Sequence, residues 1–164
     1  LTADEVDLDK VSMAIFPGGM PGSLNLDASP YTDKVIDAVK ANGGRLAAIC
    51  AAPLILGRRG LLNGKRATCY PGFEKELVGA VCLTDAVVTD GNITTSRGMG
   101  TALAFAKELI ALIKGKEEAE ALSDRIGIMS NGVLKAQGTA EELKKLAKTD
   151  DFEEAFVRIA GDEI

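Results

Sequence analysis

The stretch LAAICAAPLILGRRG, residues 46–60, decides the fold. Its first four residues, 46–49, are small or apolar, which is typical of a strand buried on both faces of a parallel sheet. Residues 51–59 follow as an apolar helical pattern, with Pro53 near the position where a helix begins. A buried strand that passes directly into a helix indicates an α/β fold.

Strand and helix patterns alternate on both sides of this stretch, from residue 11 to about residue 115. Asp90-Gly91-Asn92 separates two short runs of β-forming residues, and an Asp-Gly pair is typical of a tight hairpin turn. In the predicted helix at residues 98–114 we expect the core-facing residues to be Leu103, Leu109, Ile110 and Ile113. The predicted strands are residues 11–16, 46–49, 86–89 and 93–96, and the predicted helices are residues 31–42, 51–59 and 98–114.

The charge content rises after residue 116, and a second pattern begins. Residues 126–129 and 133–136 flank Ser130-Asn131-Gly132, which predicts a second hairpin. Two amphipathic helices are expected at residues 140–147 and 152–159. Thr139 and Glu142 have the spacing of a capping box at the start of the first of them.

Composition excludes several classes of function. The 164 residues include 19 Lys and Arg against 24 Asp and Glu, a net charge of −5, so nucleic acid and anionic membrane are poor partners. No apolar run is long enough for a membrane-spanning helix. Without His the chain cannot build a Cys–His dyad or a His-bound zinc site. Three Cys without paired spacing indicate a reducing, cytoplasmic setting, and we expect neither a metal nor a cofactor.

Cys50 lies at the corner between the predicted buried strand and the following helix. Small neighbours allow a sharp turn there, and the free amides at the start of a helix favour a thiolate over a thiol. Open α/β sheets bind ligands at the carboxyl ends of their strands, so this residue is a candidate nucleophile at an elbow. The alternative is a small buried apolar residue, which is the usual state of a free Cys. We expect Cys69 and Cys82 to have that packing role.

Two other loops follow predicted strands and are candidates for binding. Gly18 and Gly19 follow the first strand, and a Gly pair lets backbone amides approach an oxyanion or a carboxylate closely. Arg97 follows residues 93–96 and has the geometry to pair a carboxylate, although a surface ion pair would explain it equally well.

Three ordered stretches resemble the ThiJ/PfpI family: FPGGMPGSLNLDAS (16–29), AAICAAPLILGRRGLLNGKRATCYPGFE (47–74) and VVTDGNITTSRGMGTALAFAKELIALIKGKEEAEAL (87–122). The resemblance covers roughly residues 1–122 and implies a flavodoxin-like three-layer sandwich with a mostly parallel sheet, usually dimeric. It implies that Cys50 is the nucleophile and that the amides of Gly19 and Ala51 face the substrate oxygen. Tyr70 occupies a position where some members have a His, which makes it a candidate for substrate binding with Gly18 and Arg97.

Members of the family begin with a strand and helix that carry a Glu hydrogen-bonded to the nucleophilic sulfur. By the resemblance, this segment of about 60 residues would lie before Leu1. We therefore expect an N-terminally truncated sheet and a Cys50 that lacks its carboxylate partner.

The tail resembles a different class of protein. SDRIGIMSNGVLKAQGTAEELKK (123–145) and DDFEEAFVRIAG (151–162) are similar to the C-terminal end of an ATP-binding cassette ATPase. We expect residues 1–116 to form a partial ThiJ/PfpI-like domain and residues 117–164 to form the appendage. The motifs that bind nucleotide phosphates and Mg²⁺ are absent from these residues, so we expect no ATPase activity.

Three functional interpretations remain open. The first is a Cys-dependent enzyme that acts on small 2-oxoaldehydes, as a glyoxalase, or on glycated proteins, as a deglycase, with activity impaired by loss of the Glu. The second is a redox-sensing or chaperone-like protein without turnover, and the third is an inactive chimeric fragment. In each case we expect a homodimer or cover of the open sheet edge by the tail hairpin.

Overall fold

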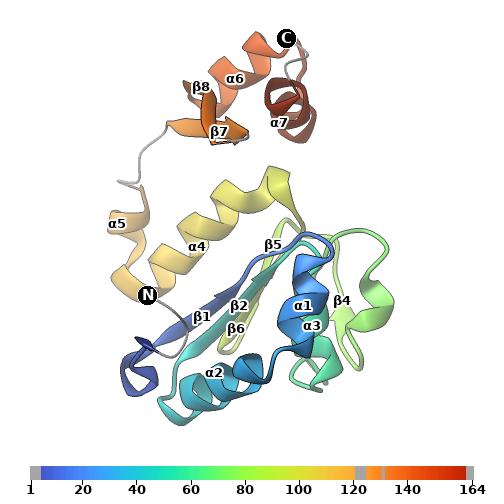
Figure 1. The fold of residues 1–164 in the computed structure, drawn as a ribbon, viewed down its shortest axis with the longest axis vertical. Helices are drawn as coiled ribbons and strands as arrows, with labels where there is room; N and C mark the ends of the chain where they lie inside the picture. Colours follow the sequence, from blue (N-terminus) through green and yellow to red (C-terminus); the bar gives the residue numbers. More distant parts are fainter. Residues whose placement is uncertain (1–4, 121–124, 131, 162–164) are drawn as a thin grey trace. The chain divides into compact units, whose positions relative to one another are not determined.

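The computed structural model describes residues 5–120, 125–130 and 132–161. They belong to two compact units, one within residues 1–113 and the other within residues 114–164 (Figure 1).

The first unit is built on a four-stranded sheet with the order β1-β2-β6-β5. β1 (Met13–Phe16), β2 (Arg45–Ile49) and β6 (Ile93–Ser96) run parallel, with Ala47 opposite Ile15 on one side and Thr94 on the other. β5 (Val87–Asp90) pairs antiparallel with β6 across the turn at Gly91, whose φ is 64°. The predicted mostly parallel sheet and its hairpin are therefore confirmed.

Helices cover both faces of this sheet (Figure 1). α1 (Gly22–Ala28), α2 (Pro30–Ala41) and α3 (Pro53–Arg58) lie on one face, and α4 (Ala102–Lys114) lies on the other. β2 is buried on both sides, because Leu46 and Ala48 pack with α2 and α3, whereas Ala47 packs with α4. The expectation of a strand without a solvent face is confirmed.

Shorter elements complete the first unit. A two-stranded parallel sheet, β3 (Arg66–Ala67) and β4 (Val81–Cys82), lies beside the main sheet, and neither strand was predicted. Short 3₁₀ helices also occur in the described part of this unit, among them η2 (Leu8–Lys10), η3 (Glu74–Glu76) and η4 (Met99–Thr101).

The prediction of the core face of α4 is wrong for two residues. Leu103 and Ile113 are 36% and 56% exposed, while Phe105 and Leu109 are buried against the sheet. Residues 102–114 are apolar on most sides of the helix, so the sequence pattern alone does not define which side faces the sheet.

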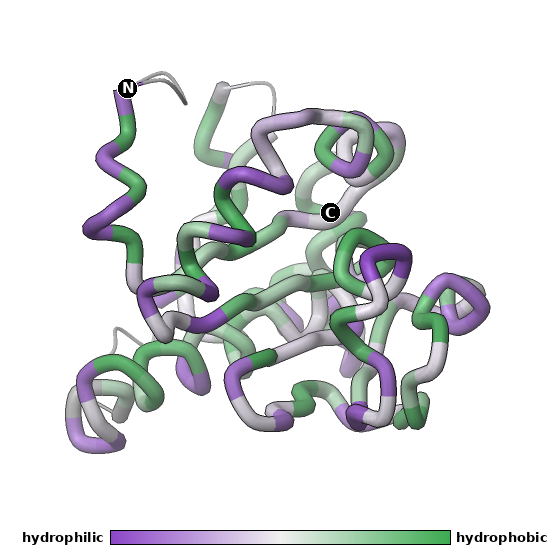
Figure 2. Tube along the Cα trace, turned by 90° about the horizontal axis from the view of Figure 1, so that it is seen from below, coloured by the Kyte–Doolittle hydropathy of each residue, from purple (hydrophilic) through white to green (hydrophobic). Residues whose placement is uncertain are grey.

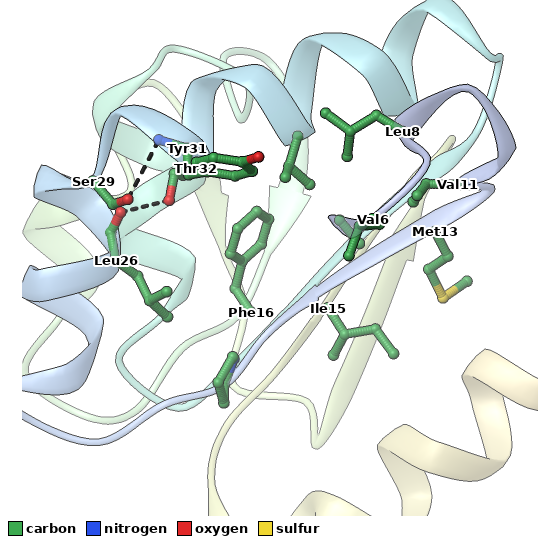
Figure 3. Close-up of a pocket in the computed structure, with 13 residues that line it drawn as sticks. Val6, Leu8, Val11, Met13, Ile15, Phe16, Leu26, Ser29, Tyr31 and Thr32 are labelled. Carbon is green, nitrogen blue, oxygen red and sulfur yellow. Dashed lines mark hydrogen bonds between the residues drawn. The ribbon is translucent and has the colours of Figure 1, made fainter. Parts of the chain in front are cut away.

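β1 forms an edge of the sheet, and within the described residues no strand pairs with its outer side. An apolar groove of about 400 Å³ runs between this strand and α2. In Figure 3, Phe16 points toward Tyr31 and Thr32 on α2, whereas Met13 and Ile15 point to the opposite face of the strand. Ile15 is 53% exposed, so an apolar side chain stands in solvent beside unpaired backbone groups.

A cluster of charged side chains joins α1 to α3. Asp27 accepts hydrogen bonds from Arg58 (2.7 Å) and from Arg59, and the same two guanidinium groups reach Glu76 (2.8 Å) and Asp33 (2.6 Å). Burial disfavours the charged form of Asp27, but the two guanidinium groups outweigh it and hold the pKa of this carboxyl below its usual range. The cluster fixes the helix that follows the candidate nucleophile.

The second unit has a small core of its own. After α5 (Lys116–Glu120), the hairpin of β7 (Ile126–Ser130) and β8 (Val133–Gly138) packs on α6 (Ala140–Leu146) and α7 (Phe152–Ala160). Ile128, Leu143 and Ile159 are buried together. The predicted hairpin and two helices are confirmed, as is the capping box, in which the Glu142 amide donates to Thr139 Oγ1 at 3.1 Å. The expected turn residue Asn131 lies outside the described residues.

Figure 2 shows that hydrophilic and hydrophobic residues are both spread along the described chain. In the described part of the chain, no helix combines the length and the apolar character that crossing a membrane requires.

Replacing the exposed apolar side chain of the edge strand should reduce self-association. We expect Ile15→Lys to lower the apparent mass in light scattering at high protein concentration, because a charge on an edge strand opposes pairing with another strand. Val78→Lys is the matched control, since Val78 is 60% exposed and lies outside the strands. Association that is unchanged in Ile15→Lys would show that the open edge does not mediate it.

Removing the shared carboxylate of the charged cluster should destabilise the first unit in a pH-dependent way. We expect Asp27→Asn to lower the free energy of unfolding by about 1–2 kcal/mol at pH 7. The folded chain has the lower pKa, so this contribution is present above about pH 4 and disappears as the pH falls below it. Urea unfolding of both proteins at several pH values measures the difference. Asp37→Asn, on an exposed part of α2, should show none of it.

Candidate functional site

The carboxyl ends of the three parallel strands open into one cavity of about 470 Å³. The loop after β1, the corner after β2 and the loop after β6 each supply part of its wall, as expected for the ligand-binding edge of an open α/β sheet. The lining residues are Gly18, Gly19, Ile49, Cys50, Tyr70, Gly98, Met99 and Ala102.

Cys50 is held in a backbone conformation that few residues other than Gly adopt. Its φ is 65°, in the left-handed region, where a side chain costs roughly 1–2 kcal/mol. Two backbone hydrogen bonds hold the residue there: its amide donates to the Ser96 carbonyl at 2.9 Å, and its carbonyl accepts from the Tyr70 amide at 2.8 Å. The side chain is half-buried at the cavity. This geometry is that of a nucleophile elbow with a sulfur in place of a hydroxyl.

Gly18 allows the loop after β1 to pack directly on the elbow. A Cβ atom at this position would lie 2.4 Å from Cys50 Cβ and 2.8 Å from the Ile49 carbonyl oxygen. Only a residue without a side chain fits at this distance. Substrate binding by Gly18 stays a prediction, whereas the structure shows that Gly18 packs on the elbow.

The amides predicted to face the substrate oxygen are those of Gly19 and Ala51. In the described part of the chain, the backbone N–H groups of Gly19 and Ala51 donate no hydrogen bond. Gly19 lines the cavity with a φ of 90°, and its carbonyl is occupied by the amide and hydroxyl of Ser23. Ala51 is only 2% exposed and is not a lining residue, so its part in binding the substrate oxygen stays a prediction. Unpaired amides beside a nucleophile are suited to a developing oxyanion.

The remaining two predicted residues lie in different places. Tyr70 lines the cavity and is 42% exposed. Arg97 does not line it, because its guanidinium reaches the Thr84 carbonyl at 3.4 Å. The structure therefore brings Tyr70 together with Cys50 but leaves Arg97 outside the cavity wall, and its role in substrate binding stays a prediction.

Sequence analysis missed Met99 and Ala102, which form the wall after β6. A hydroxyl network fixes this wall: Ser96 Oγ and Thr101 Oγ1 lie 2.6 Å apart, and the Gly98 amide donates to Thr101 Oγ1 at 3.0 Å. The available signal was topological, since neighbouring parallel strands end at the same edge of the sheet.

The other two cysteines are not part of the cavity. Cys69 is buried, and burial, with the nearby charge of Glu74, raises the pKa of its thiol to about 12. Cys82 is exposed, with its sulfur 3.7 Å from the Glu74 carbonyl oxygen. The expected packing role agrees with the burial of Cys69. It does not agree with Cys82, which is exposed. Within residues 5–120, 125–130 and 132–161, no group of three or more acidic or Cys side chains could hold a metal ion.

The fold and the site together define an α/β protein with a cysteine at a strand-to-helix elbow. The model of the DJ-1/PfpI family, also called ThiJ/PfpI, matches residues 1–112, and the chain belongs to this family. The predicted family membership is confirmed.

Known relatives agree with this assignment. Protein dj-1beta of Drosophila melanogaster is 36% identical over 129 residues, which are 77% of this chain and 69% of that protein. Its crystal structure superimposes with a TM-score of 0.66 over 73% of this chain and 65% of that one. A deglycase of Pyrococcus abyssi is 35% identical, over 70% of this chain and 69% of its own. A glutathione-independent glyoxalase of Caenorhabditis elegans is 33% identical, over 66% and 58%. The chain spans as little as 28% of a DJ-1 homologue of Arabidopsis thaliana.

Adding a methyl group at the loop that packs on the elbow should disturb the site. We expect Gly18→Ala to lower the free energy of unfolding by about 1–3 kcal/mol. The added methyl group would overlap the Cys50 side chain and the Ile49 carbonyl, so the loop after β1 and the elbow must move apart. Gly22→Ala is the matched control, since a Cβ there would meet nothing within 4 Å. Urea unfolding measures both, and equal stability of the two variants would contradict the close packing of Gly18.

Proposed function

We propose that this chain is a cysteine-dependent protein of the glyoxalase or deglycase type, acting on small 2-oxoaldehydes or on their adducts with proteins. The observation that carries the proposal is the left-handed backbone of Cys50 at the mouth of a cavity with unpaired amides beside it. Non-Gly residues in this conformation concentrate at functional sites, because the strain is kept only where geometry matters.

The proposed first chemical step is the addition of the Cys50 sulfur to the aldehyde. The Cys50 thiolate attacks the aldehyde carbon, a C–S bond forms, and the carbonyl π electrons move onto oxygen. The amides of Gly19 and Ala51 hydrogen-bond to that oxyanion until it is protonated to the hemithioacetal. In this proposal Tyr70, which lines the cavity, contacts the substrate.

Completing the isomerisation of methylglyoxal to lactate needs a base that moves a proton between adjacent carbons. None of the described residues that line the cavity is a carboxylate. We therefore expect isomerisation, and with it methylglyoxal consumption, to be slow but dependent on Cys50.

Substituting the sulfur tests the proposal directly. We expect Cys50→Ser to reduce methylglyoxal consumption at least about 100-fold, because the hydroxyl is a much weaker nucleophile. Cys82→Ser is the control, since Cys82 is exposed and outside the cavity, and it should consume methylglyoxal at the original rate. Consumption that persists in Cys50→Ser would refute the proposal. If the original chain consumes no methylglyoxal, the proposal is also refuted, and that result favours an inactive chain.

A second candidate is a redox sensor without turnover. The half-buried sulfur beside unpaired amides is suited to a sulfinate, which those amides would stabilise. Peroxide treatment that adds about 32 Da at Cys50, in a chain that consumes no methylglyoxal, would favour this role.

We further propose that the protein is a homodimer and that residues 117–164 are an appendage of the ATP-binding cassette type without ATPase activity. The open edge of β1 supports association, and the separate core of the second unit supports an appended module.

A further inference from the structure

A buried hydroxyl on β6 holds a chain segment that in turn contacts the elbow. The Thr68 amide donates to Thr95 Oγ1 at 2.9 Å, and both residues are at most 1% exposed. Two residues further on, the Tyr70 amide donates to the Cys50 carbonyl at 2.8 Å. Thr95 does not line the Cys50 cavity, so its route to the site runs through residues 68–70.

Thr95 lies on the side of the sheet where this segment needs an acceptor. It is opposite Ala48 of β2, and residues paired across neighbouring strands point to the same face of a sheet. Ala48 belongs to the core below α2 and α3. The Thr68 amide is buried on that side, and a buried N–H group without an acceptor is unfavourable. The Thr95 hydroxyl therefore makes this path of the chain possible.

The side chain of Thr68 has no share in the attachment. Its Oγ1 atom is buried and, among the residues that the structure describes, has no hydrogen-bond partner. The segment is held through its backbone amide, and the hydroxyl that holds it is the one on β6.

The contact from Tyr70 determines how the peptide after Cys50 is oriented. The Cys50–Ala51 peptide is trans, so the Cys50 carbonyl and the Ala51 N–H lie in one plane and point in opposite directions. A donor that fixes the carbonyl on one side therefore fixes the direction of the N–H on the other. That N–H is the one that the proposed function assigns to the substrate oxygen.

We infer that Thr95 is a positioning residue for the elbow: its hydroxyl holds residues 68–70, and through the Tyr70 amide it fixes the direction of the Ala51 N–H. The hold on residues 68–70 is independent of the proposed function. The consequence for the Ala51 N–H rests on the proposed function, which gives that group a substrate oxygen to bind.

Amide hydrogen exchange in the full chain tests the hold on this segment. Thr95→Val keeps the shape of the side chain and removes the acceptor, so we expect the Tyr70 amide to exchange at least about tenfold faster relative to the Leu46 amide. The Leu46 amide donates to the Asn92 carbonyl near the other end of β2, and general loosening of the sheet would accelerate both amides. Thr95→Ser restores the acceptor and should return the ratio to within about twofold of the original.

Thr94→Val is the matched control. Thr94 is 2% exposed on the opposite face of the same strand, and its hydroxyl contacts Thr89 Oγ1 at 3.0 Å. Thr68→Val is a second control, because it keeps the backbone amide and removes only the unpartnered hydroxyl. Both variants should leave the exchange ratio unchanged.

Protection of Cys50 measures the consequence for the site. Methylglyoxal that has added to the sulfur, with the thiol proton transferred to the adduct oxygen, blocks alkylation by iodoacetamide. Peptide mass spectrometry reads the labelling at Cys50 and, as a reference, at the exposed Cys82. We expect Thr95→Val to raise the methylglyoxal concentration that halves Cys50 labelling at least about fivefold, because the adduct oxygen loses a well-directed donor. Thr95→Ser should restore the original concentration, and Cys82 should respond alike in all variants.

An unchanged exchange ratio in Thr95→Val would overturn the inference. Equal acceleration in Thr94→Val would do the same, as would a Thr95→Ser variant that fails to restore the ratio. If Thr95→Val does not fold, exchange in the original chain decides: the Thr68 and Tyr70 amides should open as one unit, with protection factors within about threefold of each other. A Tyr70 amide that opens far more readily than the Thr68 amide would contradict the hold.

The two experiments separate this inference from the proposed function. Faster Tyr70 exchange with unchanged protection of Cys50 would refute the role given to the Ala51 N–H. An original chain in which methylglyoxal fails to protect Cys50 would refute the proposed function, and the exchange ratio would still decide whether Thr95 holds the segment.

Discussion

The contact between Gly18 and Cys50 is the constraint on which the site depends. β1 and β2 are adjacent parallel strands, so the loops that leave them must pass each other at the same edge of the sheet. The Cys50 backbone turns into the left-handed region to start toward α3, and its Cβ then occupies the space that a side chain at residue 18 would need. A glycine in one loop is therefore the condition for a strained cysteine in the other.

Ordinary packing maintains this strained residue. Ala51 and Ala52 are buried, Leu54 to Leu56 fill the core below them, and the cluster around Asp27 holds the end of α3 to α1. The hydrogen bonds from Cys50 to Ser96 and from Tyr70 to Cys50 join the elbow to two further segments. Stability that the unit gains from its core offsets the local backbone cost at Cys50, as is common at functional sites.

The same sheet is less well protected at β1. The strand Met-Ala-Ile-Phe carries no Lys, Pro or bulge, the usual features of an edge strand, and it has the composition of an interior one. The second unit buries its apolar side chains in a core of its own. It needs that core because a two-stranded hairpin is stable only when other elements, here helices, pack against one of its faces. The two units therefore follow from different burial requirements along one chain.

The sequence by itself determined the elements and the central feature of the site. The apolar run before Cys50 specified a buried strand, the Asp-Gly pair specified a hairpin turn, and the position of the sulfur between strand and helix specified an elbow, because each depends on local pattern. The tertiary structure alone decided which side of α4 faces the sheet, that Met99 and Ala102 form the cavity wall, and that Arg97 turns away toward Thr84. These outcomes depend on contacts between residues distant in sequence, which local pattern does not encode.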